Sequence, residues 1–362
     1  MSLRAKQIKQ FLALCGGASG AARFFEKEDL ARALADAWLA KRDDAVRVPL
    51  RQIVGMPGNP RAGYVLITLD VGANGGLVDF LIDSGATAAL VSPKLREMIG
   101  DECREGAAIR GLGSMGETVR QKITIDAVSV GSETLGPLDA VVTDLSAAGL
   151  PDVVGGLLGL DFLSRFECDF DFAEKTIRLY PRGAIACGAL DVAGLVEVPL
   201  ATHPTGLKTV RIRLNGCEPF PAVVDMGSFL SVVNWMAAAR GGVAPDSPET
   251  RPSELTATGI DGRTMPMATA PFDLEVCGRE GLGTKSEGAT KSSLTSDYRG
   301  RCCVGDLPAF AALGAETAPF ASMGLDVLGR GRTVVVAGED VVYLTPGGTP
   351  ADGWEGEVGG EG

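Results

Sequence analysis

The chain has 362 residues, 45% hydrophobic and 22% charged, which is enough for two or three units that each bury a core. Its formal net charge of −12 argues against general nucleic-acid affinity, because phosphate binding needs a basic surface. The single histidine, His203, lies in a turn-like Ala-Thr-His-Pro-Thr-Gly segment, which argues against a histidine-based catalytic triad.

The N-terminal segment, residues 1–44, is predicted to be helical. Residues 5–40 contain two apolar runs at helical spacing, separated by a glycine-rich turn. The basic start is followed by only a short apolar run, so no secretory signal is predicted. No stretch of the chain is long and apolar enough for a transmembrane helix.

From residue 46 the sequence pattern changes to one that is typical of an all-β domain. Short Val-, Ile- and Leu-rich runs alternate with Gly, Pro, Asn and Asp. The predicted strands include residues 64–71, 78–82, 123–130, 138–142 and 176–180. The tail, residues 347–362, is mostly Gly and Glu and is predicted to be disordered.

This β region contains an internal duplication. Five segments recur in the same order. They pair residues 46–50 with 196–200, 80–85 with 222–227, 109–113 with 257–261, 158–163 with 323–328, and 177–181 with 342–346. The second copy carries a polar insert, roughly residues 281–300, whose composition predicts a surface loop.

Each copy places one carboxylate at the end of an apolar run. Asp83 follows the run Val78–Ile82, and Asp225 occupies the equivalent place in the second copy. Burying a carboxylate there is costly unless it is hydrogen-bonded or functional. Gly85 and Gly227 follow two residues later and would let the backbone turn tightly around each carboxylate. The sequence therefore predicts a pair of functional carboxylates.

These motifs carry a family resemblance. Asp83-Ser84-Gly85 after an apolar run, with the Leu-Leu-Gly segment of residues 157–163 further along, resembles one lobe of the retropepsin-like and pepsin-like aspartic proteases. The resemblance covers about residues 46–346. It implies a mainly β, two-lobed pseudo-dimer of β-barrel halves, residues 45–185 and 186–346, behind a small helical N-terminal segment.

The resemblance also implies a reaction, aspartic-type endopeptidase hydrolysis. Two carboxylates about 3 Å apart share one proton. The ionised carboxylate of the Asp83–Asp225 pair would activate a water, and the protonated one would hydrogen-bond the peptide carbonyl. No metal or cofactor is implied. The partner would be a peptide or protein substrate, and one chain would suffice for the active site.

A flap over the substrate is expected at Gly111, Leu112 and Gly113. These residues belong to a glycine-rich segment typical of a β-hairpin, and the family's flaps close over substrate in this way. No tyrosine lies between residues 100 and 120, so the segment is more similar to a retropepsin flap than to a pepsin flap.

The second copy departs from the family pattern. A hydroxyl residue normally follows each catalytic aspartate and ties the two loops together; Ser84 supplies it in the first copy, but Met226 cannot. Ser228 could still donate to the Asp225 carboxylate, and Gly227 is expected to support the Asp83–Asp225 pair as well. Met226 keeps a second interpretation open, in which a catalytically degenerate protease fold serves as a peptide- or protein-binding module.

The N-terminal segment is similar to a SAP-like helix–loop–helix, on the evidence of Ile8-Lys9-Gln10-Phe11-Leu12, the glycine pair that follows, and residues 25–30. Its charges leave little basic surface, which favours docking over nucleic-acid binding. The 8 cysteines form no C-x-x-C pair, which predicts free thiols in a reducing compartment. An intracellular, soluble and cytoplasmic protein is expected, with an organelle left open.

Overall fold

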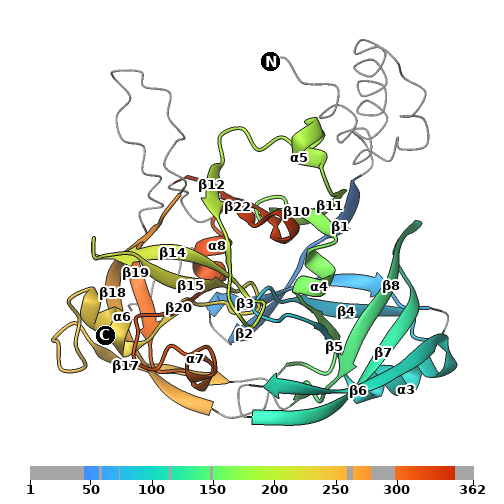
Figure 1. Cartoon of the computed structure of the whole chain (residues 1–362), viewed down its shortest axis with the longest axis horizontal. Helices are drawn as coiled ribbons and strands as arrows, with labels where there is room; N and C mark the ends of the chain where they lie inside the picture. The colour runs from blue at the N-terminus through green and yellow to red at the C-terminus, as the bar shows by residue number, and fades with distance from the viewer. Residues whose placement is uncertain are drawn as a thin grey trace.

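A computed structural model describes residues 45–56, 59–72, 74–113, 116–146, 150–258, 264–278 and 298–346. The predicted SAP-like segment, most of the polar insert and the predicted disordered tail lie outside these residues. Within them, the strands form three sheets, two of eight strands and one of six. The prediction of a mainly β, two-lobed pseudo-dimer is confirmed (Figure 1).

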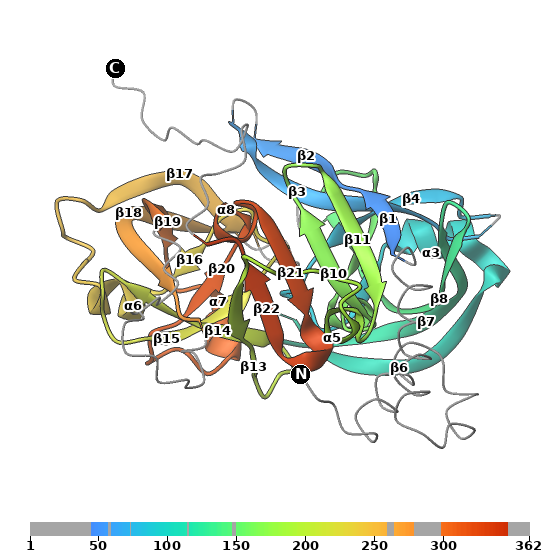
Figure 2. The ribbon, with the colours of Figure 1, turned by 90° about the horizontal axis from the view of Figure 1, so that it is seen from above.

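The six-stranded sheet joins the two halves of the chain (Figure 2). All its neighbours are antiparallel, and its central pair sets Asp169 opposite Val334. In spatial order its strands are β1 (Val46–Pro49), β11 (Thr176–Pro181), β10 (Phe166–Asp171), β21 (Arg332–Val336), β22 (Val341–Leu344) and β12 (Val196–Pro199). Each copy of the repeat supplies one half of this sheet, so the pseudo-twofold axis passes between β10 and β21.

The first lobe is built on one eight-stranded sheet. In spatial order its strands are β2 (Arg51–Met56), β3 (Asn59–Asp70), β4 (Leu77–Ile82), β9 (Val154–Leu158), β5 (Ala89–Val91), β8 (Glu133–Val142), β7 (Gly116–Val130) and β6 (Cys103–Gly113). A further pairing of β3 with β7, through Asp70 and Ser129, closes the sheet into a barrel.

The second lobe repeats this strand order. In spatial order its strands are β13 (Ala201–Thr202), β14 (Lys208–Leu214), β15 (Phe220–Val224), β20 (Ala321–Met323), β16 (Val232–Val233), β19 (Tyr298–Val304), β18 (Thr264–Val276) and β17 (Arg251–Thr258). The pairing of β14 with β18 closes this barrel too. The polar insert lies between β18 and β19, and residues 298–300 at its expected end belong to β19.

Short helices also occur in matched positions. Ser92 caps α3 by accepting the Leu95 amide at 3.1 Å, and Asn234 caps α6 by accepting the Ala237 amide at 2.8 Å. The helical elements are α3 (Pro93–Ile99), η2 (Gly100–Glu102), α4 (Leu160–Leu163), α5 (Ala184–Cys187), α6 (Trp235–Arg240), α7 (Pro308–Ala312), α8 (Leu325–Leu328) and η4 (Ala337–Glu339). None of the helices in the described ranges is long and apolar enough to cross a bilayer.

One hydrophobic cluster runs through both barrels and the six-stranded sheet. It includes Phe80 and Phe170 from the first copy and Phe272 and Val335 from the second. Strand β4 is buried at every residue except its first, since neighbouring strands and both faces of the sheet cover it. Central strands covered in this way are mostly apolar in sequence, and the one polar residue of β4, Asp79, is paired with Arg51. This is why the runs before Asp83 and Asp225 can be recognised in the sequence.

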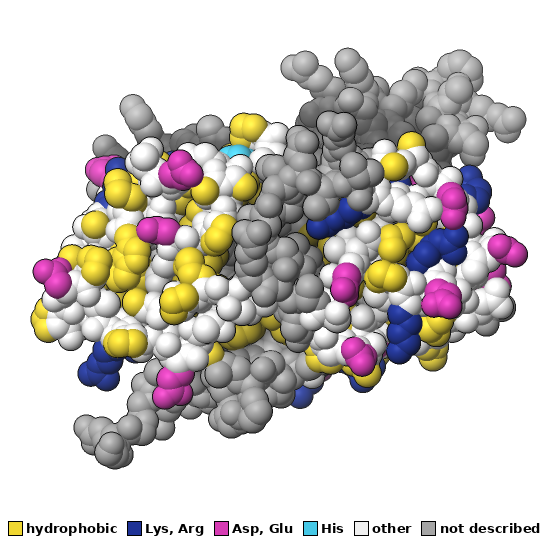
Figure 3. Space-filling model, turned by 90° about the horizontal axis from the view of Figure 1, so that it is seen from below, with side chains coloured by type: hydrophobic (Ala, Val, Ile, Leu, Met, Phe, Trp, Pro, Cys, Tyr) yellow, Lys and Arg dark blue, Asp and Glu magenta, His cyan; other side chains and the backbone are white. Residues whose placement is uncertain are grey.

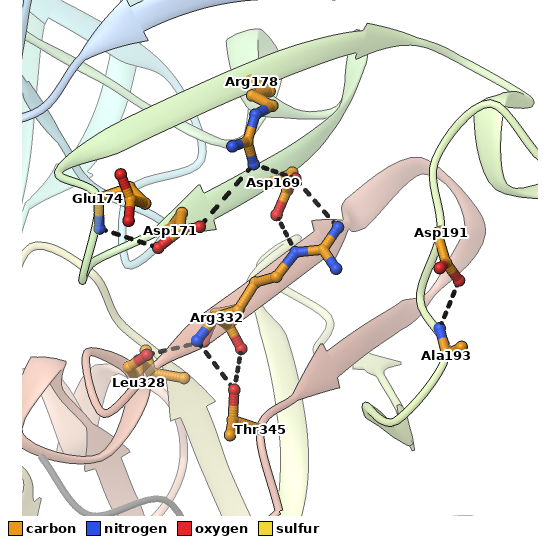
Figure 4. A network of polar contacts seen from close by, with 10 residues as sticks. Asp169, Asp171, Glu174, Arg178, Asp191, Ala193, Leu328, Arg332 and Thr345 are labelled. Atoms are coloured by element: carbon orange, nitrogen blue, oxygen red, sulfur yellow. Dashed lines mark hydrogen bonds and ion pairs between the residues drawn. The ribbon is translucent and has the colours of Figure 1, made fainter. Parts of the chain in front are cut away.

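A buried ion-pair network crosses the pseudo-twofold axis in the six-stranded sheet (Figure 4). Asp169 on β10 has a fully buried side chain. It accepts hydrogen bonds from Arg178 of the neighbouring strand at 3.1 Å and from Nε of Arg332, on the strand of the other copy, at 2.7 Å. The carboxylate is thus paired on both sides, as a buried charge requires.

Candidate active site

Asp83 and Asp225 occupy equivalent loops. Asp83 follows β4, which runs parallel to β9, and Asp225 follows β15, which runs parallel to β20. The backbone amide of Asp83 donates to the Leu158 carbonyl at 3.0 Å, and that of Asp225 donates to the Met323 carbonyl at 3.0 Å. The apolar-apolar-Gly segment of each copy therefore anchors the aspartate loop beside it, and both aspartates are half-buried.

The two loops interlock through their glycines. A Cβ on Gly85 would lie 2.6 Å from Oδ1 of Asp225, and a Cβ on Gly227 would collide with Oδ1 of Asp83. Each carboxyl group therefore lies against the glycine of the opposite loop. Only a residue without a side chain permits this approach, which explains the Asp-x-Gly pattern in both copies.

Ser84 ties the loops together from the first lobe. Its hydroxyl donates to the Val224 carbonyl at 2.8 Å and accepts from the Met226 amide at 2.9 Å. The Met226 side chain is buried in the main core cluster and offers no hydroxyl for a reciprocal pair of bonds. One half of the interlock is thus present, made by Ser84 with the backbone of the other lobe.

The two carboxylates have different donors. In each loop the glycine amide donates to the preceding aspartate, Gly85 to Asp83 at 2.9 Å and Gly227 to Asp225 at 3.0 Å. Asp225 receives a further bond, from the Ser322 hydroxyl to Oδ2 at 2.8 Å. The Ser228 hydroxyl, expected to donate to Asp225, donates instead to the Leu230 carbonyl at 2.7 Å.

Burial and mutual charge shift the titration of the pair. Burial raises the pKa of Asp83, and the negative charge of Asp225 adds to it, bringing the pKa to about 8. Burial also raises the pKa of Asp225, but the hydrogen bond from Ser322 opposes that rise. The two groups therefore titrate as a pair, because the negative charge of Asp225 disfavours ionisation of Asp83.

An aromatic contact bridges the lobes beside the pair. Tyr64 on β3 meets Phe229, in the loop after Asp225, edge to face with ring centroids 5.8 Å apart. Burial raises the pKa of Tyr64, and the charges of Asp225 and Asp83 raise it further. This phenol is therefore a neutral neighbour of both carboxylates.

The predicted flap segment forms the end of a hairpin. β6 pairs with β7, Gly111 opposite Thr118 and Gly113 opposite Gly116, with the intervening tip outside the described residues. In the second lobe, β17 pairs with β18 in the same way. Figure 3 shows the side of the molecule on which these hairpins lie. On this side, hydrophobic side chains gather on the second lobe and charged side chains on the first.

Three neighbours of the pair were not singled out from the sequence: Ser322, Tyr64 and Phe229. Ser322 could have been noticed, because extending the repeat by one residue sets it against Leu157, a polar residue against an apolar one. Tyr64 and Phe229 carry no such signal, since only the folded chain brings them together. His203, set aside as a turn residue, contacts Thr205 and the Leu313 carbonyl.

Comparison with known proteins supports the family resemblance over the first lobe. The Asp_protease_2 model, described as aspartyl protease, matches residues 67–162. This range includes Asp83, Ser84 and Gly85, the flap segment and the Leu-Leu-Gly segment. The match to the aspartyl protease family therefore covers the part of the first lobe that holds Asp83.

One curated relative is the DNA damage-inducible protein 1 of Neurospora crassa, 28% identical over 144 residues, or 39% of this chain. The match spans only 31% of that relative's length. Similar solved structures include a retropepsin-like aspartic protease from Rickettsia conorii, with 20% identity and a TM-score of 0.25, covering 37% of this chain and 89% of that one. Another is an aspartic proteinase from Irpex lacteus, with 14% identity and a TM-score of 0.46, covering 85% and 98%.

Proposed function

We propose that this protein is an aspartic endopeptidase whose catalytic pair is Asp83 and Asp225, with its lobes at residues 45–185 and 186–346. The observation that carries the proposal is the crossed packing of each carboxyl group against the glycine of the opposite loop. The charge of Asp225 also acts on Asp83, and two carboxyl groups coupled in this way share a proton, which is the state that aspartic proteases use.

The chemistry follows from that shared proton. The ionised carboxylate takes a proton from a water held between the two aspartates, and the water oxygen attacks the peptide carbonyl carbon. The protonated carboxyl donates to the carbonyl oxygen as negative charge develops on it. Ser84, Gly85 and Gly227 hold the two loops in register for this step, and no metal or cofactor takes part.

The substrate of this reaction is a peptide or protein segment in an extended conformation. It would lie between the lobes, under the hairpin that carries Gly111, Leu112 and Gly113, and pair its backbone with strand edges. Both aspartates come from one chain, so a monomer suffices. The described cysteines are all free thiols, and from this we infer a reducing, intracellular compartment.

The test is cleavage of a mixed peptide library from acidic to neutral pH, with and without pepstatin. Replacing Asp83→Asn or Asp225→Asn should lower kcat/KM by about a thousandfold, because each removes one partner of the proton exchange. Asp191→Asn is the matched control, since its carboxylate is exposed and its contact among the described residues is with the Ala193 amide, at 2.8 Å. Cleavage that survives both active-site replacements would rule out the proposal.

A second candidate is a catalytically degenerate fold that binds peptides, and Met226 is the observation that favours it. With no hydroxyl at this position, the interlock lacks its second half. Peptide binding without cleavage at any pH, unaffected by Asp83→Asn, would support this candidate. The two bonds that Ser84 makes to the backbone on either side of Asp225 are the reason we place it second.

A further inference from the structure

The hydroxyl of Ser322 breaks the pseudo-symmetry of the carboxylate pair. Ser322 lies on β20 and is nearly buried, with 7% of its surface exposed, and its hydroxyl donates to Oδ2 of Asp225 at 2.8 Å. In the first lobe the equivalent strand position is Leu157: Leu157 pairs with Leu81 as Ser322 pairs with Val223. Leucine offers no donor.

Asp83 therefore lacks a counterpart to this bond. Within the described residues, its carboxylate accepts from the Gly85 amide, and the Ala86 amide also favours its ionised form. No side-chain hydroxyl there donates to it. A donor fixed on one carboxylate stabilises the negative charge on that group more than on its partner. The asymmetry thus decides where the single negative charge of the pair resides.

Among the residues that the structure describes, no other charged group near the pair opposes this assignment. The titratable groups that face Asp225 from the elements packed around it are Asp83, from the opposite loop, and Tyr64, from β3. Tyr64 stays neutral, because its pKa lies above the ordinary value for tyrosine. Burial acts on both aspartates in the same direction. The hydroxyl of Ser322 is the difference that remains.

We propose that Ser322 is a positioning residue that fixes the negative charge on Asp225 and leaves the shared proton on Asp83. The catalytic consequence rests on the proposed function. Asp225 is then the base that takes the water proton, and Asp83 gives its proton to the carbonyl oxygen, producing a gem-diol. When the C–N bond breaks, Asp225 returns its proton to the leaving nitrogen. Asp83 then recovers a proton from one of the two hydroxyls.

The assignment can be measured without relying on activity. The full chain is labelled with ¹³C at the aspartate carboxyl carbon, and the two resonances are identified with Asp83→Asn and Asp225→Asn. In a coupled pair both resonances move in both titration steps, so the larger amplitude in the first step marks the group that ionises first. We expect Asp225 in the native chain. A larger first-step amplitude at Asp83 would overturn the proposal.

Three variants separate positioning from general structural support. Ser322→Ala should raise the midpoint of the first step by about one pH unit, a tenfold change in the proton equilibrium, and Ser322→Thr should restore it. Combining Ser322→Leu with Leu157→Ser moves the hydroxyl to the first lobe and should reverse the order of ionisation. An unchanged order and midpoint in Ser322→Ala would contradict the proposal even if that variant folds normally.

Kinetics then distinguish this inference from the proposed function. If the chain cleaves peptides, the acidic limb of kcat/KM should move up in Ser322→Ala by the same shift as the first carboxyl midpoint. If the chain is inert but Asp225 ionises first, the proposed function fails and the inference stands. If the chain cleaves peptides and Asp83 ionises first, the inference fails and the proposed function stands.

Discussion

At the scale of single residues, two hydroxyls hold the site: that of Ser84 acts across the axis between the lobes, and that of Ser322 acts within the second lobe. Ser84 reaches from the first lobe to the backbone around Asp225, while Ser322 reaches the Asp225 carboxylate from its own lobe. Both bonds converge on the second loop. Met226 has no hydroxyl, yet its amide donates to Ser84 and its side chain packs in the core.

Replacing Ser84→Ala should destabilise the fold by about 2 kcal/mol, because two buried bonds between the lobes are lost. The measurement is urea unfolding of the full chain. The control is Ser228→Ala, whose hydroxyl donates only to the Leu230 carbonyl two residues away, at an expected cost of about 1 kcal/mol. An equal fall in the free energy of unfolding in the two variants would show that the bonds of Ser84 between the lobes stabilise the fold no more than the local bond of Ser228.

At the scale of elements, the six-stranded sheet joins the two barrels through β10 and β21. The Asp169 carboxylate accepts from Arg178 and Arg332, so one buried charge connects three strands and both copies of the repeat (Figure 4). The two arginine side chains keep 20% and 29% of their surface exposed, whereas the Asp169 side chain between them is fully buried. The pairing fixes how the two barrels meet.

The Asp169→Asn variant should be destabilised by about 3 kcal/mol, because it leaves two partly buried cations without their shared anion. Thermal and urea unfolding would measure the loss. Asp191→Asn again serves as control, and the expected change there is within about 0.5 kcal/mol, since its carboxylate is exposed. A loss in Asp169→Asn no larger than in the control would contradict a structural role for the network.

At the scale of the whole molecule, bringing the two lobes together perturbs the carboxylates that they share. The pKa of Asp83 rises to about 8 in the folded chain because burial and the charge of Asp225 both disfavour its ionisation. In the unfolded chain the same group titrates near its ordinary value of about 4. Between these values, the folded state holds a proton that the unfolded state has released.

The stability of the fold should therefore fall as pH rises from about 4 to about 8, by up to about 1.4 kcal/mol per pH unit for one such group. Urea unfolding at pH 5, 6, 7 and 8 gives the slope. Asp83→Asn removes the titrating group, so its slope should be smaller across that window. Parallel slopes in the native and Asn chains would exclude Asp83 as the source.

Much of the fold could be predicted because its signals are local. The apolar runs of the central strands, the glycines two residues after each aspartate, and the ordered repeat are all visible along the chain. The predicted strands fall within β3, β4, β7, β8 and β11, with only Val71 beyond the end of its strand. The composition predicts that the polar insert extends to about residue 300, but Tyr298–Gly300 pair with β18 and belong to β19.

The site could be predicted only in part. The sequence places Asp83 and Asp225 at equivalent positions, and burial costs make such paired carboxylates stand out. It suggested Ser228 as a donor to Asp225 because the two are close along the chain. In the folded loop, the Leu230 carbonyl takes that hydroxyl, and Ser322 approaches Asp225 from a strand 97 residues away.

By itself, then, the sequence determined the duplication, the mainly β architecture and the two aspartate loops, because strand burial and tight turns depend on residues near one another in the chain. Tertiary structure alone decided how the loops cross, that Ser84 bonds to both sides of Asp225, and that Ser322 serves one carboxylate and not the other. These contacts join residues far apart in sequence, and a hydrogen bond depends on distances that only the packed barrels define.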